Sequence, residues 1–132
     1  MNDGRARRVV VTAAVIERAG AYLVTRRPEG VHLAGLWEFP GGKVDAGESL
    51  PGCLAREIRE ELGCEIDVHH EVFSISHTYP ERVVELHFFD CTLKGEPVAA
   101  LGQELRWVPR EELRSLHFPP PDHGLIELLS AR

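Results

Sequence analysis

The chain has 132 residues, of which 43% are hydrophobic, enough to fill the core of one domain but too few for two. Its formal net charge of −6, from 21 acidic and 15 basic residues, has the wrong sign for gripping a nucleic-acid backbone. We therefore expect one domain over residues 1–132, with a flexible tail at 1–7, and no nucleic-acid polymer as partner. A polyphosphate ligand would need its charge offset by a divalent metal and a few placed Arg or Lys side chains.

Cysteine usage and hydropathy bear on the compartment of the protein. Cys53, Cys64 and Cys91 form neither a C-x-x-C pair nor a Cys/His cluster, so we expect reduced thiols in the core. The apolar run from Val9 to Ile16 leads into Glu17 without a cleavage site, which favours a strand over a signal peptide. No stretch approaches the roughly 20 apolar residues of a membrane span. The sequence thus predicts a cytoplasmic protein with no membrane partner.

Strands, a broken loop and a long helix are expected in the first half of the chain. Residues 9–17 and 21–27 are apolar or β-rich and are separated by a turn containing glycine, which predicts a hairpin. The segment LWEFPGGKVDAGES at 36–49 is interrupted by glycines and a proline, so we expect it to lack regular structure. Residues 50–62 predict a helix with an N-cap at Ser49 and a stop at Gly63.

The second half of the chain mixes strands with short helices. Strands are predicted at 71–78 and 82–93, divided by a Tyr-Pro-Glu turn, because the second alternates apolar and polar residues. A short strand at 105–108, a short helix at 109–116 and a terminal helix at 125–131 follow. Since no βα unit repeats, the fold class is α/β with a mixed sheet rather than a doubly wound parallel sheet.

The helix expected at 50–62 carries carboxylates where an apolar face should be. On a helical wheel Glu57 and Glu61, one turn apart, fall inside the apolar arc, and Glu60 lies at its edge. A charge run on a helix is most often a solvated face. Partly buried like charges repel and lose hydration, however, so they persist only if something positive lies between them. Mg²⁺ prefers such oxygen ligands and bridges to phosphate, so the pattern favours a magnesium site.

The spacing of the charged and glycine residues resembles the Nudix box, G-x5-E-x7-R-E-U-x-E-E-x-G-U, in which U is a bulky apolar residue. The matching residues are Gly42, Glu48, Arg56, Glu57, Ile58, Glu60, Glu61, Gly63 and Cys64. Only Cys64 is a soft match, at a position that merely packs. The resemblance to MutT-like Nudix hydrolases continues through TRR at 25–27, LWEFPGGK at 36–43 and FPPPD at 118–122. It implies a mixed β-sheet sandwiched between α-helices.

This resemblance also implies an activity and a set of roles. The implied reaction is the Mg²⁺-dependent hydrolysis of a nucleoside triphosphate to the monophosphate and pyrophosphate, by attack at the β-phosphorus, with Mn²⁺ able to substitute. The implied metal ligands are the Gly42 carbonyl and the carboxylates of Glu57, Glu60 and Glu61. Glu57 is the candidate for activating water, Arg56 for orienting a carboxylate, and Glu48 for holding Arg56 or ligating metal.

Five further residues are candidates for substrate binding: Arg27, Phe39, Lys43, Tyr79 and Asp122. Arg27 and Lys43 could contact the phosphates or the base edge, or could be solvated cations. Phe39 and Tyr79 match aromatic positions around the base in MutT-like proteins, although isolated aromatic residues are more often part of a core.

Asp122 stands where relatives specific for 8-oxoguanine carry Asn, whose side chain both donates and accepts hydrogen bonds. An ionised Asp only accepts, which suits the amino group of cytosine, whereas a raised pKa would let it donate. MutT-like relatives that act on CTP and 5-methyl-dCTP carry Asp here. The sequence therefore favours a cytidine or broad nucleotide preference, with 8-oxo-dGTP as the alternative.

One departure and two alternatives stay open. Leu101 occupies a position where many MutT-like members carry a Glu that contacts metal or water, and Glu104 could replace it. A nucleoside-diphosphate-X hydrolase is disfavoured by the short chain and the FPPPD turn. A nucleotide-binding module without activity is disfavoured because all box carboxylates are present. The oligomeric state, monomer or homodimer, is not specified by the sequence.

Overall fold

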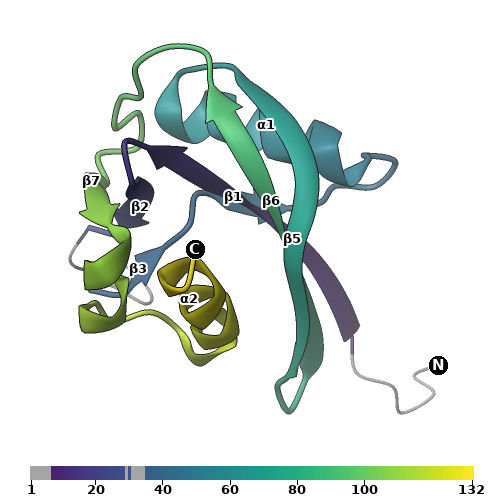
Figure 1. Ribbon diagram of the computed structural model, residues 1–132. Helices are drawn as coiled ribbons and strands as arrows, with labels where there is room; N and C mark the ends of the chain where they lie inside the picture. Colours follow the sequence, from purple (N-terminus) through teal and green to yellow (C-terminus); the bar gives the residue numbers. More distant parts are fainter. Residues whose placement is uncertain (1–6, 29, 31–34) are drawn as a thin grey trace, which may run out of the picture.

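A computed structural model describes residues 7–28, 30 and 35–132 (Figure 1). The elements, in chain order, are β1 (Arg7–Arg18), β2 (Ala21–Arg26), β3 (Trp37–Glu38), β4 (Gly41–Lys43), α1 (Leu50–Leu62), β5 (Ile66–Thr78), β6 (Arg82–Leu93), β7 (Glu104–Pro109), the 3₁₀ helices η1 (Arg110–Ser115) and η2 (Pro120–Asp122), and α2 (His123–Ser130). Of the tail expected at 1–7, residues 1–6 lie outside the described part of the chain. Arg7 belongs to β1 and is therefore not part of a tail.

The sheet is mixed, as predicted, and β1 connects its two halves. β1 runs parallel to β6 over ten residue pairs and antiparallel to β4, while β5 pairs with β6. The predicted hairpin between β1 and β2 is short, with only Glu17 opposite Tyr22 and Arg18 opposite Ala21. β2 instead pairs along its length with β7, and at its end with β3. Most strand pairing is therefore long-range.

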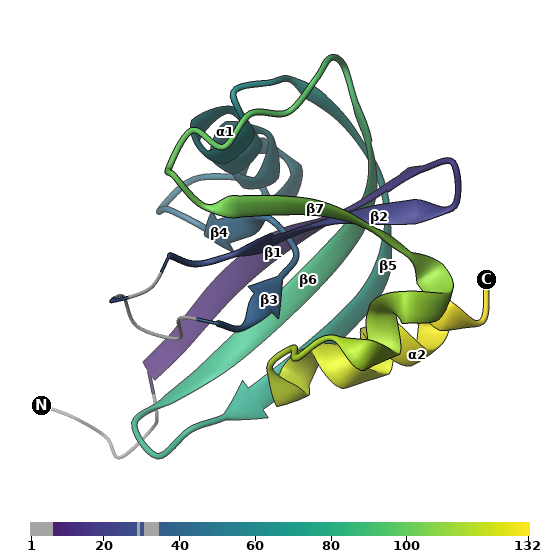
Figure 2. The same ribbon diagram turned by 90° about the vertical axis from the view of Figure 1, so that its left-hand side faces the viewer.

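Helices cover both faces of this sheet, which confirms the predicted sandwich (Figure 2). On one face, α1 buries Leu54, Ile58 and Leu62 against apolar residues of β1, β2 and β6. On the other face, α2 buries Leu125 and Leu129 in a second cluster together with residues of β1, β2 and β6. Full burial of a Leu side chain contributes about 1.5 to 3 kcal/mol, so these two clusters hold the layers together.

Helix α1 begins and ends where its sequence predicts. The Ser49 side chain accepts a hydrogen bond from the Gly52 N–H at 3.0 Å, and Pro51 occupies the first turn. Gly63 ends the helix in the left-handed conformation, with φ of 63°, and its N–H reaches the Arg59 carbonyl. The helix that carries most of the Nudix box is thus defined locally at both ends.

Five elements differ from the sequence-based expectation. The segment at 36–49 was expected to be irregular, but it contains the short strands β3 and β4, paired with β2 and β1. The helix expected at 109–116 is the 3₁₀ helix η1, and α2 starts two residues earlier than expected. Strand β5 begins at Ile66 rather than Glu71. The short strands were missed because their partners are distant in sequence.

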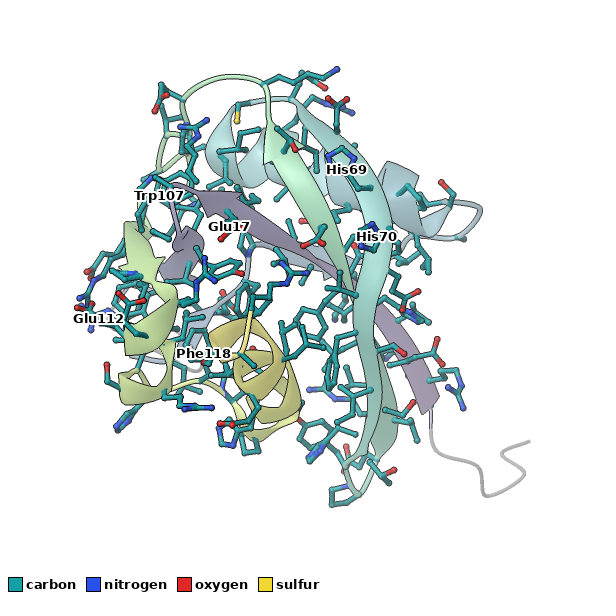
Figure 3. The ribbon with its side chains drawn as sticks, viewed as in Figure 1. Glu17, His69, His70, Trp107, Glu112 and Phe118 are labelled. Atoms are coloured by element: carbon teal, nitrogen blue, oxygen red, sulfur yellow. The ribbon has the colours of Figure 1, made fainter. Side chains whose placement is uncertain are left out.

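The early start of β5 was missed because register shifts on either side of Glu71 disturb its alternation. His69 contacts the Thr92 hydroxyl at 2.8 Å and His70 lies 3.4 Å from the Asp90 carboxylate. Thr92 and Asp90 are two residues apart on β6, so the two consecutive histidines of β5 share one face (Figure 3). A regular strand would place them on opposite faces.

All three cysteines are buried and free, as expected of reduced core thiols. Among the helices of the described residues, none has the length and apolar character needed to cross a membrane.

Candidate active site

The glycine pair of β4 lies directly against the carboxylates of α1. A Cβ added at Gly42 would collide with the Glu57 carboxyl group, so a larger residue here would force that carboxylate to move. The Gly41 N–H donates a hydrogen bond to the Glu61 Oε2 at 3.2 Å. The structure thus brings together Gly42, Glu57 and Glu61, three of the four predicted metal ligands.

Arg56 connects the loop before α1 to the carboxylates on the helix. Its Nε and Nη2 donate to both oxygens of Glu48, at 2.7 and 2.9 Å. Its Nη1 donates to Glu57 at 3.0 Å and to Glu60 at 3.2 Å. The guanidinium group holds the pKa of Glu48 down at about 2, helped by the Asp45 N–H. Arg56 therefore bridges the Glu48 carboxylate of the loop and the Glu57 and Glu60 carboxylates of the helix.

The carboxyl groups of Glu57 and Glu61 both have raised pKa values. Burial raises the pKa of Glu61 to about 8, and the nearby carboxylates of Glu57 and Glu38 add to the shift. Burial also raises the pKa of Glu57, against the opposing effect of Arg56. Two carboxylates that are costly to ionise together are suited to a cation, which would lower both pKa values.

The donor set fits a hard divalent cation. Carboxylate oxygens of Glu57 and Glu61 and the backbone carbonyl of Gly42 are ligands that Mg²⁺ or Mn²⁺ takes readily. Glu60 lies farther out, with its side chain 55% exposed and paired with Arg56. Over residues 7–28, 30 and 35–132, no group of three or more His, Cys, Asp or Glu side chains is already arranged around a common metal position. A bound cation would thus have to draw Glu60 inward from Arg56.

A cavity of about 290 Å³ extends from Glu61 and the glycine pair of β4 to the turn before α2. Its lining includes all five predicted substrate-binding residues, Arg27, Phe39, Lys43, Tyr79 and Asp122. Apolar side chains of β1 and β6 also line it, among them Val84 and Leu86. An adjoining hollow shares Arg27, Glu38 and Glu61 with it and reaches Leu101. One continuous space therefore joins the carboxylate end to the Asp122 end, which suits a ligand with a charged part and a flat part.

Asp122 is the buried acid of this cavity. The residue is only 6% exposed, and its side chain makes no capping hydrogen bond to α2. Burial raises its pKa to about 7, and the Glu38 carboxylate adds to the rise while His123 opposes it. At neutral pH the group is therefore divided between a form that only accepts hydrogen bonds and a form that also donates.

The other predicted binding residues differ in how free they are to meet a ligand. Phe39 is buried and stacks on Phe118, with ring centroids 5.4 Å apart, so it forms a wall rather than a mobile lid. Tyr79 is 39% exposed at the rim, where the Arg82 guanidinium lies 5.5 Å from its ring. Arg27 donates to Glu38 at 3.2 Å. Lys43 is exposed at the carboxylate end of the cavity.

Two charged lining residues were not predicted from the sequence, Glu38 and Arg82. Both lie within segments whose neighbours were singled out, but neither belongs to a motif with an evident chemical role. Their placement depends on the pairing of β3 with β2 and on the turn between β5 and β6. Periodicity alone carries no signal of either.

Glu104, the candidate to replace the missing carboxylate at Leu101, pairs with an arginine. Arg26 donates to the Glu104 carboxylate through its Nε at 3.1 Å, and the Arg26 guanidinium group lies over the Trp37 ring. Leu101 lines the adjoining hollow, and the residue that adds a carboxylate beside Glu61 there is Glu38.

Comparisons with known proteins place this site in a family. The NUDIX domain profile matches residues 11–128. The CTP pyrophosphohydrolase of Escherichia coli is 40% identical over 124 residues, covering 93% of this chain and 92% of that protein. The 8-oxo-dGTP diphosphatase of Haemophilus influenzae is 36% identical over 124 residues, covering 92% and 90%. The chain belongs to the Nudix hydrolase family.

The fold agrees with this membership. The solution structure of the E. coli ORF135 protein superposes with a TM-score of 0.86 at 38% identity, covering 99% of this chain and 94% of that one. The Nudix-like architecture predicted from the sequence is thereby confirmed. Nudix hydrolases act on small nucleotide substrates and generally use a divalent metal.

Proposed function

We propose that this protein hydrolyses a nucleoside triphosphate to the monophosphate and pyrophosphate in a Mg²⁺-dependent reaction, with Mn²⁺ able to substitute. The observation that carries the proposal is the pairing of Glu57 and Glu61, half-buried against Gly41 and Gly42, with a cavity that ends at Asp122. The proposal includes a monomer or homodimer in the cytoplasm, with no polymer or membrane as partner. Its test is a panel of normal, oxidised and methylated triphosphates scored by pyrophosphate release.

In this proposal Gly42, Glu57, Glu60 and Glu61 hold the metal. When bound, Mg²⁺ neutralises phosphate charge and lowers the pKa of water. Glu57 accepts the proton of the attacking water, since its raised pKa makes it a better base than an exposed carboxylate. Arg56 keeps the Glu57 carboxylate oriented, and Glu48 keeps Arg56 in place.

The remaining lining residues bind the nucleotide. Lys43 and Arg27, at the carboxylate end, neutralise the phosphates that the metal leaves uncovered. Phe39 and Tyr79 offer aromatic surface to the base, and Asp122 reads its edge. Attack at the β-phosphorus leaves the nucleoside monophosphate intact at the Asp122 end.

We infer that cytidine triphosphates, including 5-methyl-dCTP, or a broad set of modified nucleotides are the substrates. The ionised form of Asp122 accepts a hydrogen bond from the cytosine amino group. The second candidate is 8-oxo-dGTP, favoured by the raised pKa of Asp122, because the protonated form donates as Asn does. The names of the E. coli and H. influenzae relatives divide along the same line.

Replacing Asp122 should change base preference more than rate. A site built to hydrogen-bond a substrate group loses roughly 1 to 3 kcal/mol when that partner is missing. We expect Asp122→Asn to raise kcat/KM for 8-oxo-dGTP relative to CTP by on the order of tenfold, or about 1.4 kcal/mol. Asp122→Ala should flatten the preference, while the control Asp67→Asn, on the exposed part of β5, should keep it. A parental ranking in both Asp122 variants would remove this residue from base reading.

The same residue predicts that base preference depends on pH. With a pKa of about 7, Asp122 carries its extra proton below neutrality and loses it above. Each pH unit above the pKa depletes the donating form about tenfold. The ratio of kcat/KM for 8-oxo-dGTP over CTP should therefore fall as the pH rises through neutrality. Effects of pH on the shared phosphate end cancel in this ratio. Asp122→Asn should give a flat ratio, and a parental ratio independent of pH would contradict the prediction.

A further inference from the structure

A buried polar pair links β1 to α1 beneath the candidate metal site. The Thr12 hydroxyl and the Cys53 thiol lie 3.3 Å apart, and both residues are completely buried. Thr12 lies opposite Gly42 in the antiparallel pairing of β1 with β4. Burial of a polar side chain costs free energy of folding unless a hydrogen bond compensates for the lost water, and the contact between Thr12 and Cys53 provides such a bond.

The Cys53 thiol contacts backbone carbonyls of β4, the strand that contains Gly41 and Gly42. Cys53 Sγ lies 3.4 Å from the Lys43 carbonyl oxygen and 3.8 Å from the Gly42 carbonyl oxygen. Arg56 Nη2 lies 3.3 Å from the same Lys43 oxygen and 3.9 Å from the sulfur. With the Thr12 hydroxyl donating to sulfur, the thiol proton is free to bond the Lys43 carbonyl. The Gly42 and Lys43 carbonyl oxygens thus both face the Cys53 thiol, and the Lys43 oxygen also accepts a hydrogen bond from the Arg56 guanidinium group.

We propose that Thr12 and Cys53 are positioning residues that hold the backbone carbonyls of Gly42 and Lys43, so that the Gly42 carbonyl lies where it can bind metal. The inference rests on the proposed function, because it concerns the metal ligands named there. Gly42 itself is pressed against the Glu57 carboxylate and has no side chain to anchor it. Without the pair, this segment would be held mainly by its short pairing with β1 and by Arg56, which also serves Glu48, Glu57 and Glu60.

Cys91 provides a matched comparison within the same protein. It is buried in the same apolar layer as α1, and its Sγ contacts the Phe89 carbonyl at 3.4 Å. This polar contact lies within β6 and involves none of the predicted metal ligands. A thiol that merely fills the core should behave like Cys91 when it is removed. A thiol that positions the metal carbonyl should behave differently.

The test measures Mn²⁺ binding to the full chain without nucleotide, by electron paramagnetic resonance or calorimetry. Loss of a group that orients a metal ligand typically weakens metal binding about 10-fold to 100-fold. We expect Cys53→Ala to weaken Mn²⁺ binding about tenfold, and Cys53→Ser to restore most of the affinity, because a hydroxyl can make the same bonds. Cys91→Ala should keep parental affinity even if its melting temperature falls as far.

Thr12→Val provides a second route, because it removes the hydroxyl at nearly constant volume. We expect Thr12→Val, like Cys53→Ala, to weaken Mn²⁺ binding. Thr12→Val therefore tests the pair even if Cys53→Ala fails to fold. Parental affinity in folded Cys53→Ala and Thr12→Val would overturn the proposal, as would an equal loss in Cys91→Ala. If the parental chain itself bound no Mn²⁺, the proposed metal site would fall, and the role of the pair with it. The parental measurement therefore separates the two failures.

Discussion

Glu57→Gln is expected to lower kcat at least about a hundredfold, or about 2.7 kcal/mol in the activation free energy, while the protein stays folded. The amide keeps the shape of the side chain but can neither take a proton from water nor supply charge to a metal. Folding should not suffer, since burial raises the pKa of Glu57 and the neutral amide avoids that cost. Steady-state kinetics and a thermal melt of the same preparation measure both effects.

Glu65→Gln is the matched control for this variant. Glu65 lies between α1 and β5, is exposed and pairs with Arg59. Its amide variant should keep the parental kcat. Near-parental turnover in Glu57→Gln would remove Glu57 from the reaction, and an unfolded variant would show that its carboxylate is needed for structure.

Removal of divalent metal is expected to abolish activity entirely. Glu57 and Glu61 are half-buried like charges whose pKa values are raised, and without a cation they cannot both be ionised at neutral pH at low cost. Treatment with EDTA should bring pyrophosphate release to background, and added Mg²⁺ or Mn²⁺ should restore it. The melting temperature should rise on adding back metal, because a ligand that binds only the folded state stabilises it. Turnover that survives exhaustive chelation would contradict the proposed site.

Helix α1 shows how much the sequence could predict. Its ends follow from Ser49, Pro51 and Gly63, which act through local geometry, and its apolar face follows from a period of 3.6 residues. The two carboxylates inside that face stood out for the same reason. Local rules were sufficient here because every signal lies within the helix and one residue on either side of it.

The sheet shows where local rules end. The parallel pairing of β1 with β6 joins residues about seventy positions apart, such as Val11 and Leu86, and alternation names no partner. The short strand β4 exists only because β1 lies beside it. Its carbonyls could therefore be assigned to the site only through the family motif.

The conformation of long side chains was the second feature that the sequence did not predict. The helical wheel places Arg56 opposite the apolar arc, yet its long side chain folds back to Glu48 and touches Glu57. The lining residues Glu38 and Arg82 depend likewise on contacts across strands and turns. Charge and spacing singled out the candidate residues, whereas the pairing among them required three-dimensional contacts.

The identity of the reaction products tests most directly whether the protein hydrolyses nucleoside triphosphates at the β-phosphorus. CTP and 8-oxo-dGTP are each incubated with the protein and Mg²⁺ in water enriched in heavy oxygen, and the products are resolved by mass spectrometry. We expect the products to be the nucleoside monophosphate and pyrophosphate, with the heavy oxygen in pyrophosphate. Release of inorganic phosphate and a nucleoside diphosphate, heavy oxygen in the monophosphate, or no turnover of any triphosphate in the panel would contradict it.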